Sequence, residues 1–445
     1  MSQRVLMMMA AVVLMVVSAA MGAERVRIIV ETDAGGDPDD EQSMVRFLLY
    51  ANDFDVEGII ANRPRAREGE NKNVARTGLG IVRRMVGAYG KCWGNLSLND
   101  RRYPTEEFLQ KRTVAGYDDV EDGVKLLMEA VDRADDPRPV WFCNWGTDNE
   151  SGASCLKRAL DRVRKERGEV GYVKFKNKIR LSSADKFGEH TNEIGPPFVV
   201  WVDTFRPEVE RKRWYHRFSA ITATAGGFDV KRDVLAGHGP LGEMYPLNTT
   251  HPQKEGDTMT FLFLAPNGLN DEQWPDWGSW AGRYGLMPDA GEKKYWWANA
   301  EDQWEGSKHR ENTLRRWAEH LQNDFRARLD WCVKDYAHAN HPPVVRVVGG
   351  DHRIIRGGET VELNASESRD PDGGRLRFKW MFYPEVGTYR GQLPELKGTD
   401  EATASFVAPN VEEPQTLHVI LMATDEGQPP LTRYQRVVVQ VGPQK

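Results

Sequence analysis

The stretch that decides the fold is Arg27-Ile-Ile-Val-Glu-Thr-Asp-Ala-Gly-Gly-Asp-Pro-Asp-Asp-Glu-Gln-Ser43. An apolar strand, 26–30, runs into an acidic, glycine-rich turn, and a helical stretch at 42–50 follows. Four aspartates fall within eight residues: Asp33, Asp37, Asp39 and Asp40. Carboxylates this close repel one another by about 1 to 4 kcal/mol per pair. A bound cation is therefore expected among them, and oxygen-only ligands indicate a hard ion such as Ca²⁺ or Mg²⁺.

The place of this turn in the chain supports a binding site. The aspartates directly follow the first strand, and in open α/β sheets the ligand crevice lies beyond the carboxyl ends of the strands. The alternative interpretation is an acidic surface loop that holds no ligand.

Residues 1–23 have the pattern of a secretory signal peptide. Arg4 supplies the positive charge, Leu6 to Val17 is continuously apolar, and small residues follow at 18–20 and 22–23. The apolar run is too short for a transmembrane helix, which needs about 20 residues. We therefore expect an exported protein, periplasmic or extracellular, without stable membrane insertion. A retained N-terminal anchor is the alternative.

Composition limits the class of protein. The chain has 445 residues, 40% of them hydrophobic, and a formal net charge of −6, which allows two or three domains with apolar cores. Its 60 basic and 66 acidic residues are mixed without a basic block, so a nucleic acid polymer is not an expected partner. The four cysteines are widely spaced and form no zinc-type pattern with histidine.

Residues 24–340 alternate short apolar strands with amphipathic helices. This pattern predicts βαβ units, and hence an α/β domain with a mainly parallel sheet flanked by helices. The expected strands are 26–30, 56–61, 139–144, 179–182 and 197–202, and the expected helices are 73–87, 123–134 and 154–166. One more helix is expected from Leu314 to Tyr336. Pro342 and Pro343 follow it, and we place a domain boundary there.

Residues 341–445 have a different pattern, with short alternating strands separated by turns rich in Asp, Gly and Pro. The expected strands are 361–365, 376–380, 403–407, 417–423 and 434–441. Several strands at this spacing within about 100 residues predict an all-β, immunoglobulin-like sandwich.

The acidic turn resembles the signature of the calcium-dependent nucleoside hydrolases, Asp-x-Asp-Pro-Gly-x-Asp-Asp. Asp33 matches the later of the first two aspartates, and Asp39 and Asp40 match the closing pair. The chain departs from the signature in two ways. Glu31 replaces the first aspartate, and the loop is longer by two residues, which makes Asp37 an additional or alternative ligand.

A closer resemblance is to secreted bacterial proteins in which a nucleoside hydrolase-like domain precedes an immunoglobulin-like domain, some of them described as cellulose-binding. It is carried by 35–40 with Gln42-Ser-Met44, Glu255-Gly-Asp-Thr258, Pro266-Asn-Gly-Leu-Asn270, Pro275-Asp-Trp-Gly278 and 425–434. The resemblance covers essentially the whole mature chain and implies the same two-domain fold.

The resemblance implies a Ca²⁺ site and names its ligands. They are Asp33, Asp37, Asp39, Asp40, Asp257 and the backbone carbonyl of Thr147, or alternatively of Asp148. Asp39, Asn62 and Glu243 are implied as sugar contacts. Trp277 and Trp280 are expected to line the pocket, because tryptophan faces stack on sugars, and packing under a long loop is the alternative for them.

The implied reaction is hydrolysis of an N-glycosyl or other glycosidic bond in a small glycoside or polysaccharide. Asp33 would act as general base toward a metal-held water that attacks the anomeric carbon. Many nucleoside hydrolases have a histidine before the late aspartate, but this chain has Gly256. The leaving-group acid therefore stays open among Glu243, Glu255 and His251.

A non-catalytic polysaccharide-binding protein of cellulose type on the same scaffold is the alternative function. A homo-oligomer is a further expectation, because nucleoside hydrolases are commonly oligomeric.

Overall fold

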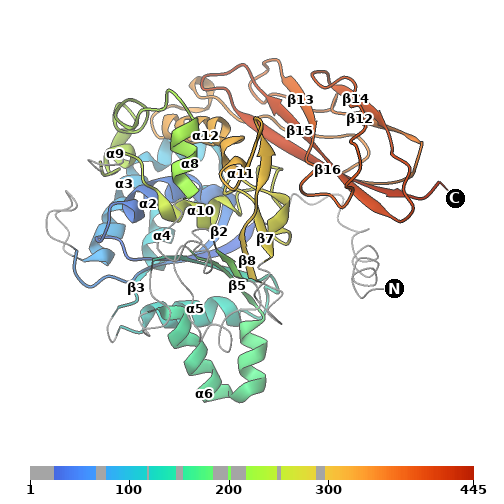
Figure 1. The fold of residues 1–445 in the computed structure, drawn as a ribbon. Helices are drawn as coiled ribbons and strands as arrows, with labels where there is room; N and C mark the ends of the chain where they lie inside the picture. The colour runs from blue at the N-terminus through green and yellow to red at the C-terminus, as the bar shows by residue number, and fades with distance from the viewer. Residues whose placement is uncertain are drawn as a thin grey trace.

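The computed structural model describes residues 25–66, 77–117, 120–146, 154–183, 199–201, 217–247, 252–286 and 296–444. These residues form an α/β domain with a mainly parallel sheet, followed by a smaller β domain at the C-terminal end (Figure 1). Both predicted fold classes are confirmed. Within the described ranges, no helix combines the length and the apolar character needed to cross a membrane.

The α/β domain is built on an eight-stranded sheet with the order β3-β2-β1-β4-β5-β6-β8-β7. Every neighbouring pair is parallel except β7 and β8. The strands are β1 (Val26–Thr32), β2 (Phe54–Ala61), β3 (Thr113–Ala115), β4 (Val140–Trp145), β5 (Ile179–Ser183), β6 (Val199–Trp201), β7 (Tyr284–Leu286) and β8 (Trp296–Asn299). All five strands expected from the sequence are found. The first strand lies inside the sheet, between β2 and β4.

Helices cover both faces of this sheet. Ile29 of β1 faces the core under α5 (Asp122–Asp132) and α6 (Cys155–Lys176). Ile28 and Val30 face the larger core on the other side, because successive strand residues point to opposite faces. That side carries α2 (Asp39–Leu49), α3 (Gly78–Asn99), α4 (Glu106–Arg112), α8 (Arg217–Thr224), α9 (Gly239–Glu243), α10 (Met259–Leu262), α11 (Asn312–Arg315) and α12 (Ala318–Asp330).

The helix expected from 314 to 336 is wrong in its extent. The chain forms α11, then α12, and then a separate short 3₁₀ turn at Tyr336–His338. The break between the two helices falls at Trp317, which is 1% exposed. Its ring centroid lies 5.4 Å from that of Tyr434 of the C-terminal domain, so the break lies at the contact between the domains.

The C-terminal domain is a sandwich of two sheets. A four-stranded sheet has the order β11-β16-β15-β13, and a two-stranded sheet pairs β12 with β14. The strands are β11 (His352–Arg356), β12 (Thr360–Asn364), β13 (Arg377–Phe382), β14 (Thr403–Val407), β15 (Gln415–Thr424) and β16 (Thr432–Gly442). Buried residues of both sheets share one core, including Val361, Phe406 and Val439. All five expected strands are present, and β11 was not predicted.

The two domains are joined by buried polar contacts. Arg433 of β16 pairs with the buried Asp324 of α12 at 2.8 Å. The Tyr383 hydroxyl donates to Asp302 at 2.6 Å, and the Tyr434 amide donates to the Asn267 carbonyl at 3.0 Å. A buried charge is stable only when it is paired, so these contacts fix how one domain sits on the other.

Candidate metal and carbohydrate site

The end of β1 places the acidic turn at the carboxyl edge of the central strands. Thr32 is in register with Ala61 of β2 and Trp145 of β4, so the residues after these three strands meet at one edge. Gly35 allows the turn, because it has a φ of +96° and a side chain there would press on Ile81. Asp39 and Asp40 then begin α2, where negative charge is favoured by the helix dipole.

Three carboxylates converge at this edge. The carboxylate oxygens of Asp39, Asp40 and Asp257 lie within 4.8 Å of one another. Asp257 lies in the 3₁₀ turn Gly256–Thr258, directly before α10, and is 4% exposed. The sequence predicted all three as ligands of one ion. The structure brings them together from segments more than 200 residues apart.

The pKa values of this group indicate that it lacks compensating positive charge. Burial raises the pKa of Asp40 well above its ordinary value, and repulsion from Asp257, Asp33 and Asp39 adds to the effect. Burial also raises the pKa of Asp39, against the opposing influence of Lys254. Asp40 itself accepts hydrogen bonds from the Thr32 hydroxyl and, at 3.1 Å, from the Asp33 amide.

The three carboxylates fit a calcium ion. Calcium–oxygen distances are about 2.3–2.6 Å, so ligand oxygens of one ion lie at most about 5 Å apart. The separations in this group satisfy that limit. A cation would also remove the repulsion that raises the pKa of Asp40.

Two predicted ligands have other partners. Lys254 binds the Asp37 carboxylate and lies 3.4 Å from Asp39, so Asp37 is not a member of the three-carboxylate group. Arg63 lies 3.2 Å from Asp33. The Asp33 side chain is 34% exposed and still acts electrostatically on Asp40, so it stands at the rim of the group. The sequence analysis did not predict that Arg63 and Lys254 belong to the site. The one available signal was their position in the sequence, next to Asn62 and close to Asp257.

Asn62 follows β2 as expected, and its side chain is used locally. The amide nitrogen donates to the Glu31 carboxylate at 2.5 Å. Glu31 is fully buried and also accepts from the Ser154 hydroxyl at 3.0 Å and the Cys155 amide at 2.8 Å. Burial raises the pKa of Glu31 despite these hydrogen bonds. The glutamate in place of the first aspartate therefore anchors the start of α6.

The expected carbonyl ligand, Thr147, and its alternative, Asp148, lie outside the described residues. His251, the third candidate for the leaving-group acid, lies outside them too. For Thr147 the structure describes only its neighbour Gly146, which has a φ of +87°. A side chain on Gly146 would come within 3.7 Å of the Asp33 carboxylate. The chain after β4 therefore leaves the sheet beside Asp33. Thr147 stays a prediction.

Neither glutamate proposed as leaving-group acid lies in position for that role. Glu255 is fully buried in an ion pair with Arg46, and it also accepts from Tyr245 at 2.7 Å and Gln253 at 2.9 Å. Glu243 is exposed at the end of α9 and lies near Cys92. Cys92 lies about 21 Å along α3 from the first residue of that helix. The acidic loop contacts the first turn of α3, so Glu243 lies beside a part of α3 that is remote from the loop.

The two tryptophans predicted to line the aspartate pocket lie at the domain interface instead. Trp280 is 1% exposed, and its indole nitrogen donates to the Tyr434 hydroxyl at 3.2 Å. Trp277 stacks on Trp274 and contacts His418 of β15 edge-on. Trp277 and Trp280 thus pack at the contact between the domains, whereas the alternative left open by the sequence was packing under a long loop.

Comparisons with known proteins agree with this description. Residues 27–284 match the family described as cellulose-binding Sde182, nucleoside hydrolase-like domain, and residues 360–441 match the C-terminal domain of cellulose-binding protein Sde0182. No curated protein matches the chain.

One solved structure agrees with the family match over nearly the whole chain. A nucleoside hydrolase-related hypothetical protein from Saccharophagus degradans, associated with carbohydrate metabolism, is 29% identical. The alignment covers 94% of this chain and 100% of that one, with a TM-score of 0.73. A PKD domain from the KIAA 1837 protein matches 22% of this chain and 86% of its own, at 15% identity and a TM-score of 0.17. The first family match spans more than half of the chain, which therefore belongs to the Sde182 family of nucleoside hydrolase-like proteins.

Proposed function

We propose that this protein binds polysaccharide, and that a calcium ion held at the carboxyl edge of the central sheet takes part in the binding. The observation that carries the proposal is the convergence of Asp39, Asp40 and Asp257. Support also comes from the descriptions of the related proteins, which are cellulose-binding or associated with carbohydrate metabolism. Oxygen ligands from three carboxylates match the preference of Ca²⁺.

The roles of the side chains follow from their positions. Asp39, Asp40 and Asp257 would hold the ion, which when bound supplies coordination positions for neighbouring sugar hydroxyls. Asp33 stands at the rim with a partly exposed carboxylate and would accept a hydrogen bond from a hydroxyl. Arg63 and Lys254 fix Asp33 and Asp37 beside the group and offset part of the negative charge of the edge.

Hydrolysis of an N-glycosyl or other glycosidic bond is the second candidate. The exposed edge of Asp33 favours it, because a general base must reach the water that it activates. Departure of the leaving group also needs a proton donor, and among the candidates that lie within the described residues neither Glu255 nor Glu243 is placed to provide one. For this reason binding is the function that the geometry supports best.

The test is a pull-down on microcrystalline cellulose with the mature chain, in calcium and in chelator. Binding in calcium that is lost in chelator and in the variant Asp40→Asn is the expected result. Equal retention in all three conditions would contradict the role of the ion. A parallel assay for reducing sugar and free base, across cellulose, cello-oligosaccharides and nucleosides, addresses the second candidate: sustained release that depends on Asp33 would establish catalysis.

We also propose that the protein is exported, on the basis of the signal-like residues 1–23. N-terminal sequencing of protein recovered from the periplasm or medium tests this. A mature chain that begins near Glu24 is expected, and an intact Met1 in the cytoplasm would contradict export.

A further inference from the structure

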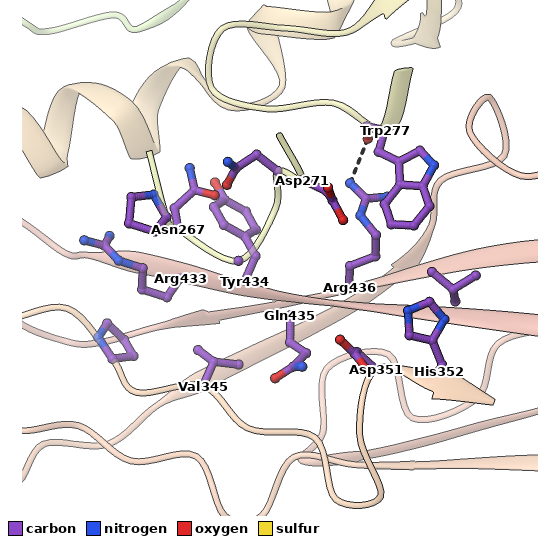
Figure 2. A pocket seen from close by; sticks show the side chains of 15 residues that line it. Asn267, Asp271, Trp277, Val345, Asp351, His352, Arg433, Tyr434, Gln435 and Arg436 are labelled. Atoms are coloured by element: carbon purple, nitrogen blue, oxygen red, sulfur yellow. Dashed lines mark hydrogen bonds between the residues drawn. The ribbon is translucent and has the colours of Figure 1, made fainter. Parts of the chain in front are cut away.

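A groove runs between the two domains, separate from the three aspartates. Its volume is about 470 Å³, within the range of about 300–1,000 Å³ typical of small-molecule sites. One wall is the loop that follows α10, with Asn267, Asp271 and Trp277, and the opposite wall includes Val345 and Asp351 (Figure 2). The groove shares no residue with the aspartate group.

Strand β16 forms the floor of the groove. It pairs with β15 along its whole length, but on its other edge it pairs with β11 only from Val438 onward. Residues 433–436 of this strand therefore line the groove directly. The edge is not open for an extended peptide to add as a strand, since the Tyr434 amide already donates to the Asn267 carbonyl.

The walls are held rigidly by contacts between the domains. Gly268 has a φ of +88°, and a side chain there would overlap the Tyr434 carbonyl. The Arg436 guanidinium donates to the carbonyls of Leu269 at 2.6 Å and Trp277 at 2.7 Å. Side chains and loops that are already fixed lose less conformational entropy when a ligand binds, so these rigid walls are suited to a binding site.

Two buried donors beside the groove have no hydrogen-bond partner within the described residues. Asn267 is 4% exposed, and its amide nitrogen has no hydrogen-bond partner within the described residues. The same holds for the Nε of Arg436, which is 7% exposed. Unpaired buried donors are costly, and both belong to side chains that line the groove. Gln435 and Asp351 add an amide and a carboxylate opposite them (Figure 2).

The charges and the polar side chains indicate the class of ligand. Arg433 is paired with the buried Asp324, so Asp271 and Asp351 face Arg436 and the groove does not favour an anionic molecule. The amide of Gln435 and the carboxylate of Asp351 are suited to hydrogen bonds with the hydroxyls of a sugar ring.

We propose that this groove is a second glycan-binding site, which takes a neutral oligosaccharide without a metal ion. The site goes beyond the proposed function, which concerns the aspartate edge. Two motifs that the aspartate edge does not use contribute to one wall of the groove: Pro266–Asn270 provides four lining residues, and Pro275–Gly278 provides Trp277.

The test is a calorimetric titration of the full mature chain with cellohexaose, once in EDTA and once in calcium. The groove variant is Asp351→Ala with Gln435→Ala, two side chains that are exposed or half-buried. The control is Gln440→Ala on the same strand, about 16 Å further along and outside the groove. Asp40→Asn removes a member of the aspartate group. Equal unfolding midpoints for the groove variant and the wild type show that the fold is retained.

Binding of cellohexaose by the wild type in EDTA is expected, about tenfold weaker in the groove variant because two hydrogen-bonding side chains are lost. Gln440→Ala and Asp40→Asn should bind as the wild type does in EDTA. Wild-type affinity in the groove variant would overturn the proposal, and so would no binding in EDTA. Binding in calcium alone, lost in Asp40→Asn, would refute the groove while supporting the aspartate edge, so the two proposals fail separately.

Discussion

Replacement of Asp40 by asparagine should raise the stability of the metal-free protein and abolish its response to calcium. Asp40 is 3% exposed, and its carboxylate lies within 4.8 Å of those of Asp39 and Asp257. At that distance, with an effective dielectric constant near 20, each pair of charges repels by about 3 kcal/mol. Lys254, at 3.4 Å from Asp39, offsets the repulsion that involves Asp39. The repulsion by Asp257 remains, so a gain of up to about 3 kcal/mol is expected.

The choice of pH decides whether this gain is visible. The pKa of Asp40 is raised in the folded protein by burial and by its acidic neighbours, so the folded state holds the proton more tightly than the unfolded state. The penalty is absent below the unfolded pKa and develops as the pH rises through the folded pKa. Unfolding by urea should therefore be measured at several pH values, and the advantage of Asp40→Asn in the free energy of unfolding should grow as the pH rises.

In saturating calcium the wild type should become more stable to unfolding than Asp40→Asn. A ligand at 1,000 times its dissociation constant stabilises the state that binds it by about 4.1 kcal/mol, which exceeds the gain of about 3 kcal/mol expected for Asp40→Asn, and only the wild type should gain this. Asp37→Asn is the matched control, because Asp37 is bound by Lys254 and lies outside the group; it should keep the calcium response. If Asp40→Asn lost stability in EDTA and still gained as much from calcium as the wild type, the assignment of the ion to these carboxylates would be refuted.

Three further predictions concern a buried ion pair near the aspartate group and two residues at the contact between the domains. Glu255→Gln leaves Arg46 as an unpaired buried charge and should lower the free energy of unfolding by about 3–5 kcal/mol; Arg46→Met in addition should recover part of it, and urea unfolding measures both. Gly268→Ala places a side chain against the Tyr434 carbonyl and should loosen the domains, seen as faster limited proteolysis between them; an unchanged digest would contradict the close approach. Burial lowers the pKa of His320, which is hydrogen-bonded to Tyr434, to about 4. The unfolded state then binds more protons between pH 6.5 and 4, so stability should fall as the pH drops through that window, and less so in His320→Gln.

The fold could be predicted because its signals are local. The apolar runs that became β1, β2, β4 and β5 have strand length and are separated by helical periodicity, and both properties are read within a few residues. Asp39 and Asp40 could be placed at the strand end for the same reason. The break between α11 and α12 was not predicted, because residues 315–318 contain no Gly or Pro; it falls at Trp317, which contacts the second domain.

The partners of the charged residues could not be predicted, because they come from distant segments. Lys254 reaches Asp37 across 217 positions, and Arg46 reaches Glu255 across 209. A carboxylate in the sequence is equally suited to bind a metal, donate a proton or neutralise an arginine, and its neighbours in space decide among these roles. Trp280 shows the same limit, since an aromatic ring stacks on a sugar or on Tyr434 depending on what covers it.

The residues lost to structural roles bear directly on catalysis. Glu31, in the place of the first aspartate of the nucleoside hydrolase signature, turns away to bind Asn62, Ser154 and the start of α6. Glu255 is neutralised by Arg46. The edge of the sheet therefore keeps three converging carboxylates that could hold a cation, whereas Glu255 is committed to Arg46 and Glu243 is exposed at the end of α9. Within the described residues this combination suits a site that grips sugar hydroxyls, and binding accounts for that geometry better than hydrolysis does.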